Sequence, residues 1–555
     1  MTGDALYIHG LIWTGSLDRS GPEPTALAVS AGRVVAVGTE EEARAVASPG
    51  CRVVDLAGRR IVPGLIDGHM HAVRAGATWD AELHWTGLPD VGSALDDIRR
   101  AARQLTTGEW IRAIGGWHPT QFAEQRTPTP TELDEAGGGH PVYLQSLYEH
   151  AVLNGAALRA SGIDRLEGDP PGGVVERDAD GNPTGIIRGL GAFSLCLNAM
   201  PVRGAAEEAA STRAMLHDLH AVGLTGLVDP GGFGMHPARY DVLFDLWRRD
   251  ELTMRLRLFL SAVDPGREVE QITGWLQHAQ SGFGDEMLRY LGVGEVVHFG
   301  CHDFEGLEPF EVSDEACGEF ERISRETARR GWPMHVHAVL DTTITRILDA
   351  WEKVHAEVPL TGLRFSLAHA DLISDHNIAR LRALGAGVVL DDHLVFKAGA
   401  SQEVWGAQAV HRAPPAGDLL RAGIPVAAGT DATRASSYSP WLSLWWLITG
   451  RSLDGVQRRA AEHLLTREQA LHAYTAGSAW LSFEEGDRGH LRPGARADFA
   501  VLDQDYFTVP DDDIPTISSV LTVVGGVVVH SSRAAAPADR AGPASAARHP
   551  EERTR

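Results

Sequence analysis

Two histidines separated by one residue follow a short apolar run near the N-terminus. Residues 61–68 are mostly apolar, and His69 and His71 come directly after them, on either side of Met70. Alternate side chains of an extended strand point to the same face, so the two imidazoles project together. Such a pair suits a divalent metal ion. Two partly exposed histidines after a turn are the alternative, since short pairs arise by chance in a chain with 25 histidines.

Other residue types that bind metal ions recur where later apolar runs end. They are Glu295, His337, His369 and Asp431. Each one alone has a structural explanation, because a buried histidine can be hydrogen-bonded in a core and an aspartate can cap a helix. Four histidines and two carboxylates at successive strand ends are harder to explain by chance. We therefore predict that all six converge on one site.

The elements expected around these residues alternate between strands and helices. Beyond residue 200, apolar runs of four to seven residues are followed by helical patterns and glycine-bearing turns, which is typical of repeated βα units. Together with the first run they give eight strands: 61–71, 222–229, one within 252–263, 291–298, 333–338, 363–369, 387–390 and 424–431. The pattern predicts an α/β fold, a (β/α)8 barrel of the TIM type, whose active site forms at the carboxyl ends of the strands.

Both ends of the chain read as short strands bounded by Gly, Ser and Pro. Two β-rich ends that flank a barrel suggest one composite β-sandwich built from both termini. Residues 532–555 have few large apolar side chains, which predicts a disordered tail. The expected parts are 1–61 and 485–531 for the β-sandwich, 62–484 for the barrel, and about 77–200 for an insertion after the first strand.

The composition narrows the classes of partner. The net charge of −24 argues against nucleic acid and anionic membranes. No apolar run approaches the ~20 residues that span a bilayer, and no signal peptide is evident. The four cysteines are scattered without a Cys-x-x-Cys pair, which is typical of reduced thiols. We expect a cytoplasmic protein that acts on a small molecule, with the oligomeric state left open and a homodimer as a candidate.

The stretches around the predicted site resemble the amidohydrolase superfamily. They are Pro63–His71, His337–Asp341, Ala368–Ala370 and Gly429–Asp431. Four stretches of the insertion are similar to the narrower amidohydrolase family 3 (YtcJ-like) branch: Gly116–His118, Leu133–Asp134, Tyr148–Asn154 and Asp180–Gly185. The resemblance spans roughly residues 5–531. It implies a distorted TIM barrel, a composite β-sandwich and one or two divalent metal ions, usually zinc.

The resemblance also implies roles for the strand-end residues. His69, His71 and Asp431 would bind the more buried metal ion, and His337 and His369 the second. Zinc lowers the pKa of water and polarises a carbonyl group. Asp431 would then take a proton from the attacking water and pass it to the leaving nitrogen. The implied reaction is hydrolysis of a carbon–nitrogen bond in an amide, formamide or cyclic amide.

The bridge between the two metal ions departs from the usual pattern. Many relatives use a carbamylated lysine on the fourth strand, but the only lysines here are Lys353 and Lys397, in other parts of the chain. Some relatives use a glutamate, and Glu295 is the residue that we predict, with His298, His302 and Asp303 as competitors. His335 shares a strand face with His337, and we favour a hydrogen-bonded core role for it.

Four further residues are candidates for contact with the substrate: His150, Trp117, Asp392 and His393. The first two lie in insertion stretches that are similar to the YtcJ-like branch. Packing in a core is the alternative for Trp117. The other two follow the seventh predicted strand.

Some positions leave the reaction open. Ala368 stands where relatives often have glutamate, and Asp391-Asp392-His393 replaces a common Gln-Pro. The leading hypothesis is a metal-dependent hydrolase. A metal-assisted isomerase, lyase or cyclase is the second, and a metal-binding protein without catalysis is the third. Asp431 weighs against the third, since a structural metal site needs no proton acceptor.

Overall fold

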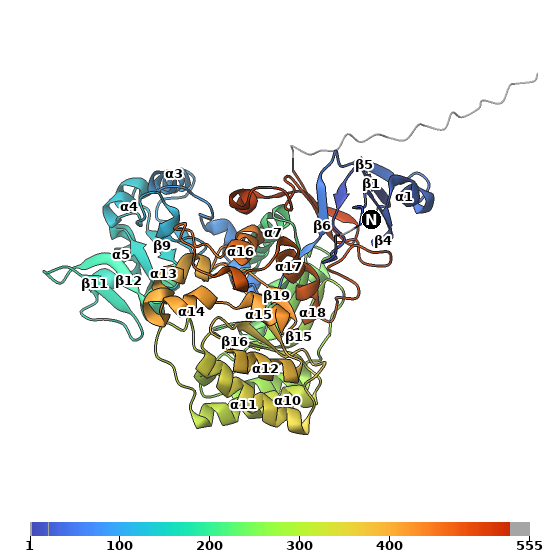
Figure 1. Ribbon diagram of the computed structural model, residues 1–555. Coiled ribbons are helices and arrows are strands. Elements are labelled where there is room, and N and C mark those ends of the chain that lie inside the picture. The colour runs from blue at the N-terminus through green and yellow to red at the C-terminus, as the bar shows by residue number, and fades with distance from the viewer. Residues whose placement is uncertain (1–2, 20, 533–555) are drawn as a thin grey trace, which may run out of the picture.

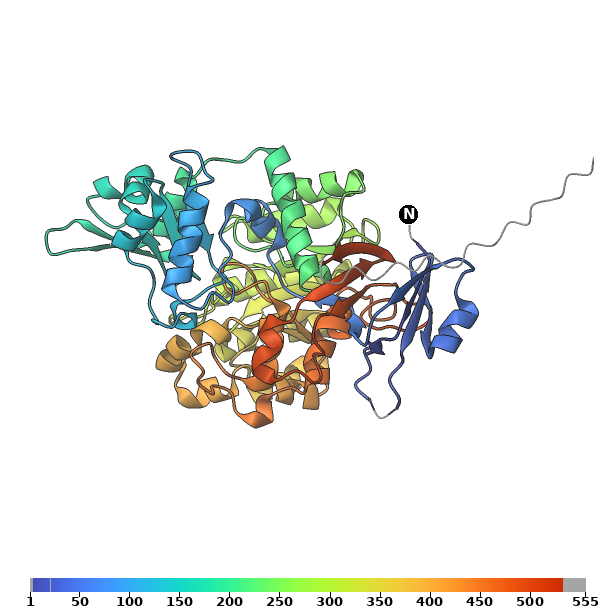
Figure 2. The same ribbon diagram turned by 90° about the horizontal axis from the view of Figure 1, so that it is seen from above.

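The computed structural model describes residues 3–19 and 21–532. A central barrel carries the β-sandwich on one side and the insertion on the other, as Figures 1 and 2 show. The segment predicted as a disordered tail lies outside the described residues from position 533 on. The exact residues at which the predicted domains begin and end stay predictions.

Eight parallel strands form the barrel in the order expected from the sequence. Two backbone hydrogen bonds join its first and last strands, from Gly68 to Ala428 (2.8 Å) and from Asp431 to His69 (2.7 Å). The predicted (β/α)8 architecture is therefore confirmed. The strands are β7 (Leu65–Asp67), β13 (Leu224–Asp229), β14 (Arg255–Leu260), β15 (Leu288–Glu295), β16 (Met334–Ala338), β17 (Ser366–His369), β18 (Gly387–Leu390) and β19 (Val426–Ala428).

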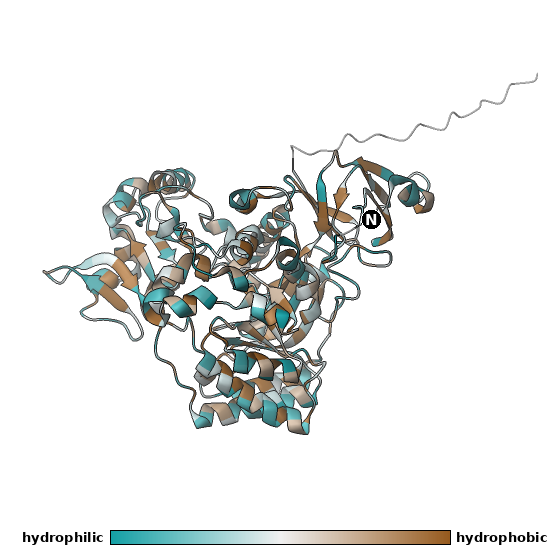
Figure 3. Ribbon diagram, viewed as in Figure 1, coloured by the Kyte–Doolittle hydropathy of each residue, from teal (hydrophilic) through white to brown (hydrophobic). Residues whose placement is uncertain are grey.

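Helices cover the outside of the barrel, and their ribbons carry both hydrophobic and hydrophilic residues (Figure 3). The apolar residues Phe320 and Ile323 of α10, for example, are buried. Serine side chains cap several of them; Ser313, for example, accepts a hydrogen bond from Ala316 N at the start of α10. The main helices are α2 (Ala72–Gly76), α7 (Ala205–Ala221), α8 (Asp241–Arg248), α9 (Glu268–His278), α10 (Asp314–Arg329), α11 (Asp341–Glu357), α12 (Asp375–Leu384), α13 (Leu394–Trp405), α14 (Ala407–Arg412), α15 (Ala416–Arg421), α16 (Pro440–Thr449), α17 (Arg467–His472) and α18 (Ser478–Leu481).

Strands from both ends of the chain build the predicted β-sandwich. Its first sheet contains β1 (Ala5–Ile8), β3 (Ala26–Ser30), β4 (Arg33–Gly38) and β5 (Arg52–Asp55), and α1 (Glu40–Val46) packs on it. Its second sheet contains β2 (Leu11–Ile12), β6 (Arg60–Pro63), β20 (Phe499–Leu502), β21 (Ser519–Val524) and β22 (Val527–Ser531). Tyr7 and Phe499 meet edge to face between the sheets, with ring centroids 5.0 Å apart.

The insertion after β7 has its own five-stranded sheet and its own cores. Its strands are β8 (Ile111–Ile114), β9 (Val142–Ser146), β10 (His150–Leu153), β11 (Val174–Arg177) and β12 (Pro183–Arg188), and its helices are α3 (Val91–Ala102), α4 (Pro130–Gly137), α5 (Gly155–Ser161) and α6 (Gly189–Ala199). Asn154, in one of the YtcJ-like stretches, caps α5 and accepts a hydrogen bond from Val142 N. That residue has a structural role.

No helix among residues 3–19 and 21–532 is both long enough and apolar enough to cross a bilayer. Cys196, Cys301 and Cys317 are buried and unpaired, and Cys51 is partly buried and unpaired. The cytoplasmic location and the homodimer stay predictions.

A buried ion pair ties the barrel to the β-sandwich. Arg255 on β14 donates from Nε and Nη2 to the two carboxylate oxygens of Asp498, at 2.8 and 3.0 Å. Both side chains are almost fully buried. Burial raises the pKa of Asp498, but Arg255 and Arg488 lower it more, to about 2. The carboxylate therefore depends on these guanidinium groups.

We expect Arg255→Gln to lower the free energy of unfolding by about 3 kcal/mol, because it leaves a buried charge with only part of its compensation. The pKa of Asp498 is lower in the folded state than the ~3.9 of an unfolded chain. The stabilisation is therefore present above pH ~4 and is lost as the pH falls toward 2. Urea unfolding at several pH values measures it. Arg267→Gln, at a 56% exposed arginine, should change stability by less than about 0.5 kcal/mol.

Candidate metal centre

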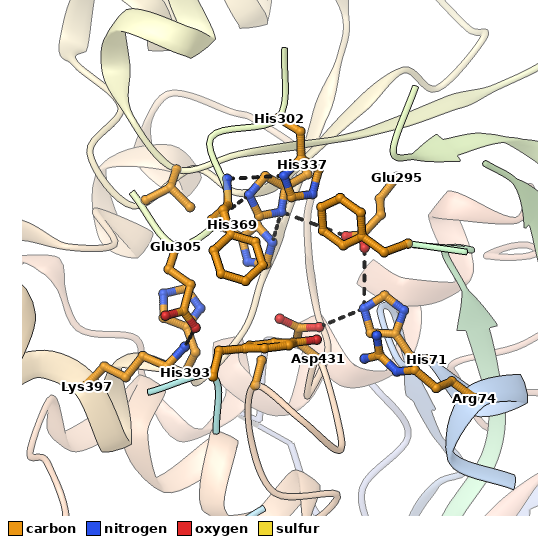
Figure 4. Close-up of a pocket in the computed structure, with 15 residues that line it drawn as sticks. His71, Arg74, Glu295, His302, Glu305, His337, His369, His393, Lys397 and Asp431 are labelled. Carbon is orange, nitrogen blue, oxygen red and sulfur yellow. Dashed lines mark hydrogen bonds and ion pairs between the residues drawn. The ribbon is translucent and has the colours of Figure 1, made fainter. Parts of the chain in front are cut away.

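His69 and His71 follow β7 and direct their Nε2 atoms at the same two carboxylates. His69 Nε2 lies 3.2 Å from Glu295 Oε2 and 3.6 Å from Asp431 Oδ1. His71 Nε2 lies 3.4 Å from Glu295 Oε1 and 3.1 Å from Asp431 Oδ1. Figure 4 shows the contacts of His71 as dashed lines. The structure thus brings the first predicted histidine pair together with both predicted carboxylates.

Glu295 is the last residue of β15 and faces both histidine pairs. Its Oε2 atom is 3.2 Å from His69 Nε2 and 3.9 Å from His337 Nδ1. Among its competitors for the bridging role, His298 is bound to Glu319 at 3.0 Å, away from the cluster. This placement favours Glu295 as the shared ligand.

His337 and His369 form the second histidine pair at the ends of β16 and β17. His337 Nδ1 and His369 Nε2 face each other at 2.8 Å. The outer nitrogen of His369, Nδ1, lies 2.5 Å from Asp391 Oδ2. The outer nitrogen of His337, Nε2, donates to Phe304 O at 2.6 Å and lies 3.2 Å from Asp303. With protons on the two outer nitrogens, the two inner ones would present lone pairs to the same point.

The hydrogen bonds of the first pair also leave both Nε2 atoms turned inward. His71 Nδ1 donates to Gly231 O at 2.9 Å, and its Nε2 atom faces the carboxylates. His69 Nδ1 is hydrogen-bonded to His335 Nε2 at 2.9 Å. The other ring nitrogen of His335, Nδ1, is hydrogen-bonded to Ser366 Oγ at 2.8 Å. His335 is thus the hydrogen-bonded core histidine that the sequence favours. His69 Nε2 is fully buried and has no hydrogen-bond partner.

The buried carboxylates of the cluster favour positive charge on the groups next to them. Burial lowers the pKa of His69, yet Asp431 and Glu295 raise it well above its usual value. Burial raises the pKa of Glu295, yet His71, His69 and His337 lower it well below its usual value. Buried oxygen and imidazole ligands with converging lone pairs fit one or two divalent cations such as zinc. The ligand atoms of His69, His71 and Glu295 lie within 4.8 Å of one another, as do those of Glu295, His337 and His369.

Carboxylates in an outer layer orient these histidines. Asp391 contacts His369 and also accepts from His393 Nδ1 at 2.6 Å. His393 Nε2 is bound in turn by Asp371 at 3.1 Å. Burial lowers the pKa of His393, but Asp371 and Asp391 raise it well above its usual value. Both ring nitrogens of His393 therefore face carboxylates, and the ring lines the pocket.

The metal-ligand cluster forms the floor of a pocket (Figure 4). The empty space within it, including its solvent-open part, is about 480 Å³. Most residues of its wall follow no strand-end motif and could not be recognised from the sequence. The additional lining residues are Arg74, Tyr148, Phe233, His302, Phe304, Glu305, Val339, Lys397 and Ala435.

Three predicted substrate contacts lie outside the lining of this pocket. Trp117 is buried in the core of the insertion, where it stacks on Phe122 at 5.8 Å and meets Trp85 edge to face. His150 lies on β10, outside the pocket lining, because β10 pairs with β9 and β12 within the insertion sheet. Asp392 points away from the pocket and accepts a hydrogen bond from Ser436 Oγ at 2.6 Å. Only His393 of the four reaches the pocket.

Lys397 reaches the pocket from α13, although the sequence placed it only as a lysine outside the fourth strand. It is buried and forms an ion pair with Glu305. Burial lowers the pKa of Lys397, but Glu305 raises it above its usual value, so the ammonium group is charged. This lysine is therefore part of the wall and not a bridge between metal ions.

Comparison with known proteins agrees with this geometry. A family model described as the amidohydrolase family matches residues 52–530. The chain is 29% identical to the N-substituted formamide deformylase of Arthrobacter pascens over 91% of its own length and 94% of the relative's. It is 28% identical to the putative amidohydrolase YtcJ of Bacillus subtilis (strain 168) over 95% and 99%.

The solved structures give a similar picture of the fold. An uncharacterised metal-dependent hydrolase of Pyrococcus horikoshii OT3 superposes with a TM-score of 0.65 at 20% identity. The superposition covers 92% of this chain and 99% of that one. At this identity the similarity concerns the fold alone.

Neighbouring aspartates provide a matched test of the outer layer. We expect Asp391→Asn to weaken Zn²⁺ binding about 10- to 100-fold, because it removes the carboxylate that orients His369. Burial and the charge of Asp391 raise the pKa of Asp392 well above its usual value, so Asp392 is a neutral acid. Asp392→Asn should therefore leave the affinity within about twofold of wild type. Competition with a chromophoric chelator measures both, and equal affinities in the two variants would contradict the assigned role.

Proposed function

The chain belongs to the amidohydrolase family and is a metal-dependent hydrolase of carbon–nitrogen bonds, and we propose that its substrates are small N-substituted formamides and amides. The observation that carries the proposal is the position of Asp431. This carboxylate lines the pocket while it lies against His69 and His71, so it can act on substrate and on water at the metal centre. The similarity to a formamide deformylase supports the substrate class.

The ligands of the more buried ion would be His69, His71 and Asp431. Those of a second ion would be His337 and His369, with Glu295 shared between the two. We propose zinc, because imidazole and carboxylate ligands suit it. When bound, such an ion lowers the pKa of water and polarises the substrate carbonyl.

Asp431 moves the proton. Burial raises its pKa, but His69 and His71 lower it well below its usual value, so the group starts as a carboxylate. It can accept the proton of the attacking water and then donate it to the departing nitrogen. The water oxygen binds the acyl carbon, the carbon–nitrogen bond breaks, and the products are an acid and an amine. The backbone bond from Asp431 N to His69 O holds the side chain in place.

His302 offers a hydrogen-bond donor to the substrate. Burial lowers its pKa to about 3, so the ring is neutral. Its Nδ1 accepts from Phe304 N at 3.1 Å, which leaves the proton on Nε2. That Nε2 atom is buried, has no partner and belongs to a residue of the pocket wall. A donor placed in this way stabilises the negative charge that develops on a carbonyl oxygen.

The aromatic part of the pocket wall suits an apolar substituent on the substrate nitrogen. Phe233 and Phe304 lie with ring centroids 6.0 Å apart, and Tyr148 of the insertion meets Phe304 at 5.2 Å. Aromatic side chains contribute large apolar contact area in a pocket. The amine part of the substrate would lie against them.

We expect Asp431→Asn to lower kcat at least about 100-fold, because the amide cannot accept the proton. Its bound metal, measured by elemental analysis, should stay close to wild type, since five other ligands remain. Asp96→Asn, at an aspartate with 73% side-chain exposure, is the control and should behave as wild type. Near-normal turnover in Asp431→Asn would remove the proton shuttle from the mechanism.

Isotopic water tests the reaction class. Hydrolysis of a formamide in ¹⁸O-labelled water should place one solvent oxygen in the formate, as mass spectrometry can measure. Turnover without label in either product would favour an isomerase, lyase or cyclase reaction on the same scaffold.

A further inference from the structure

Arg74 presents an unpaired guanidinium group to the catalytic pocket. It lies on α2, three residues after His71, so the two side chains share one side of that turn. Its Nη2 atom is buried and has no hydrogen-bond partner. Within the described residues, no carboxylate lies within ion-pair distance of Arg74, and no dashed line reaches it in Figure 4. A cation in such a place is available to a ligand.

A second arginine reinforces this positive charge. Arg434 follows Asp431 by three residues, and burial together with the charge of Arg74 lowers the pKa of Arg434. The described part of the chain offers Arg434 no carboxylate at ion-pair distance either. Arg255 and Arg257 in the same barrel are each paired with a buried carboxylate. Arg74 and Arg434 therefore lack, among the described residues, the acidic partner that Arg255 and Arg257 have.

The nearby charged groups are already engaged. Asp229 is close enough for its pKa to be affected by Arg74, but its oxygens accept from Val73 N and Gly231 N at 2.9 Å each. Lys397, the other cation of the pocket wall, is neutralised by Glu305. The unpaired positive charge of the pocket thus lies on the Arg74 side.

We propose that Arg74 binds a carboxylate of the substrate, with Arg434 behind it, so that the preferred substrates are N-formyl or N-acyl amino acids. The proposal rests on the proposed function and names its substrate class. A guanidinium fork matches a carboxylate in two parallel hydrogen bonds. In a chain of net charge −24, an anionic substrate needs such a local cation to enter.

The position of Arg74 sets where the carboxylate lies. Because Arg74 is one turn from a metal ligand, the carboxylate should be only a few bonds from the amide, as in an α-amido acid. Water adds to the acyl carbon, the carbon–nitrogen bond breaks and the nitrogen takes a proton. The carboxylate bound by Arg74 stays unchanged, and the products are formate, or another acid, and the free amino acid.

Two compounds that differ only in this carboxylate test the proposal: N-formyl-phenylalanine and N-formyl-2-phenylethylamine. The zinc-loaded protein should have a kcat/KM about 10- to 100-fold higher for the anionic compound. Arg74→Gln should remove this preference by lowering kcat/KM for the anionic compound alone, and Arg74→Lys should keep part of it. Arg165→Gln, at an arginine with 78% side-chain exposure, should keep all of it.

A binding measurement separates this proposal from the proposed function. N-formyl-phenylalanine should raise the thermal unfolding midpoint of the zinc-loaded wild type and not that of Arg74→Gln. If neither compound is hydrolysed but this difference in binding persists, the anion site stands and the proposed reaction fails. Equal kcat/KM values for the two compounds, equal losses for both in Arg74→Gln, or equal stabilisation of both proteins would overturn the role of Arg74.

Discussion

The burial of two carboxylates against four histidine rings is the constraint on which this structure depends. Glu295 and Asp431 both contact His69 and His71, and these rings lower the pKa of both carboxyl groups well below its usual value although burial raises it, so both are charged. The outer nitrogens of the rings are already bound by carboxylates, backbone oxygens or another histidine. Two buried carboxylates need positive charge beside them, and a bound cation between the inner nitrogens can supply it, which makes the cluster a candidate cation site.

Holding such a cluster requires a rigid frame, and the barrel provides it. The ligands lie at or just beyond the ends of strands, and the backbone bond between Asp431 and His69 fixes the closing seam. The pair formed by Arg255 and Asp498 anchors the same barrel to the β-sandwich. The β-sandwich thus contributes stability at a distance from the chemistry.

The insertion and the loops after the strands supply much of the pocket wall. Tyr148 comes from the insertion and packs on Phe304, which belongs to the loop after β15. Arg74 and His302 each carry a buried nitrogen without a partner, on a side chain that lines the pocket. We infer that the candidate metal ligands set the reaction and that these wall residues set which substrate can be held next to them.

The sequence by itself determined the barrel, the composite β-sandwich and the set His69, His71, Glu295, His337 and His369 with Asp431. It could do so because alternation of strands and helices places strand ends at one mouth, where local spacing is enough to bring side chains together. The tertiary structure decided the rest. Trp117 lies in a core and His150 in a sheet because packing within the insertion outweighs motif similarity. His302 and Lys397 line the pocket through contacts between segments that no local spacing encodes.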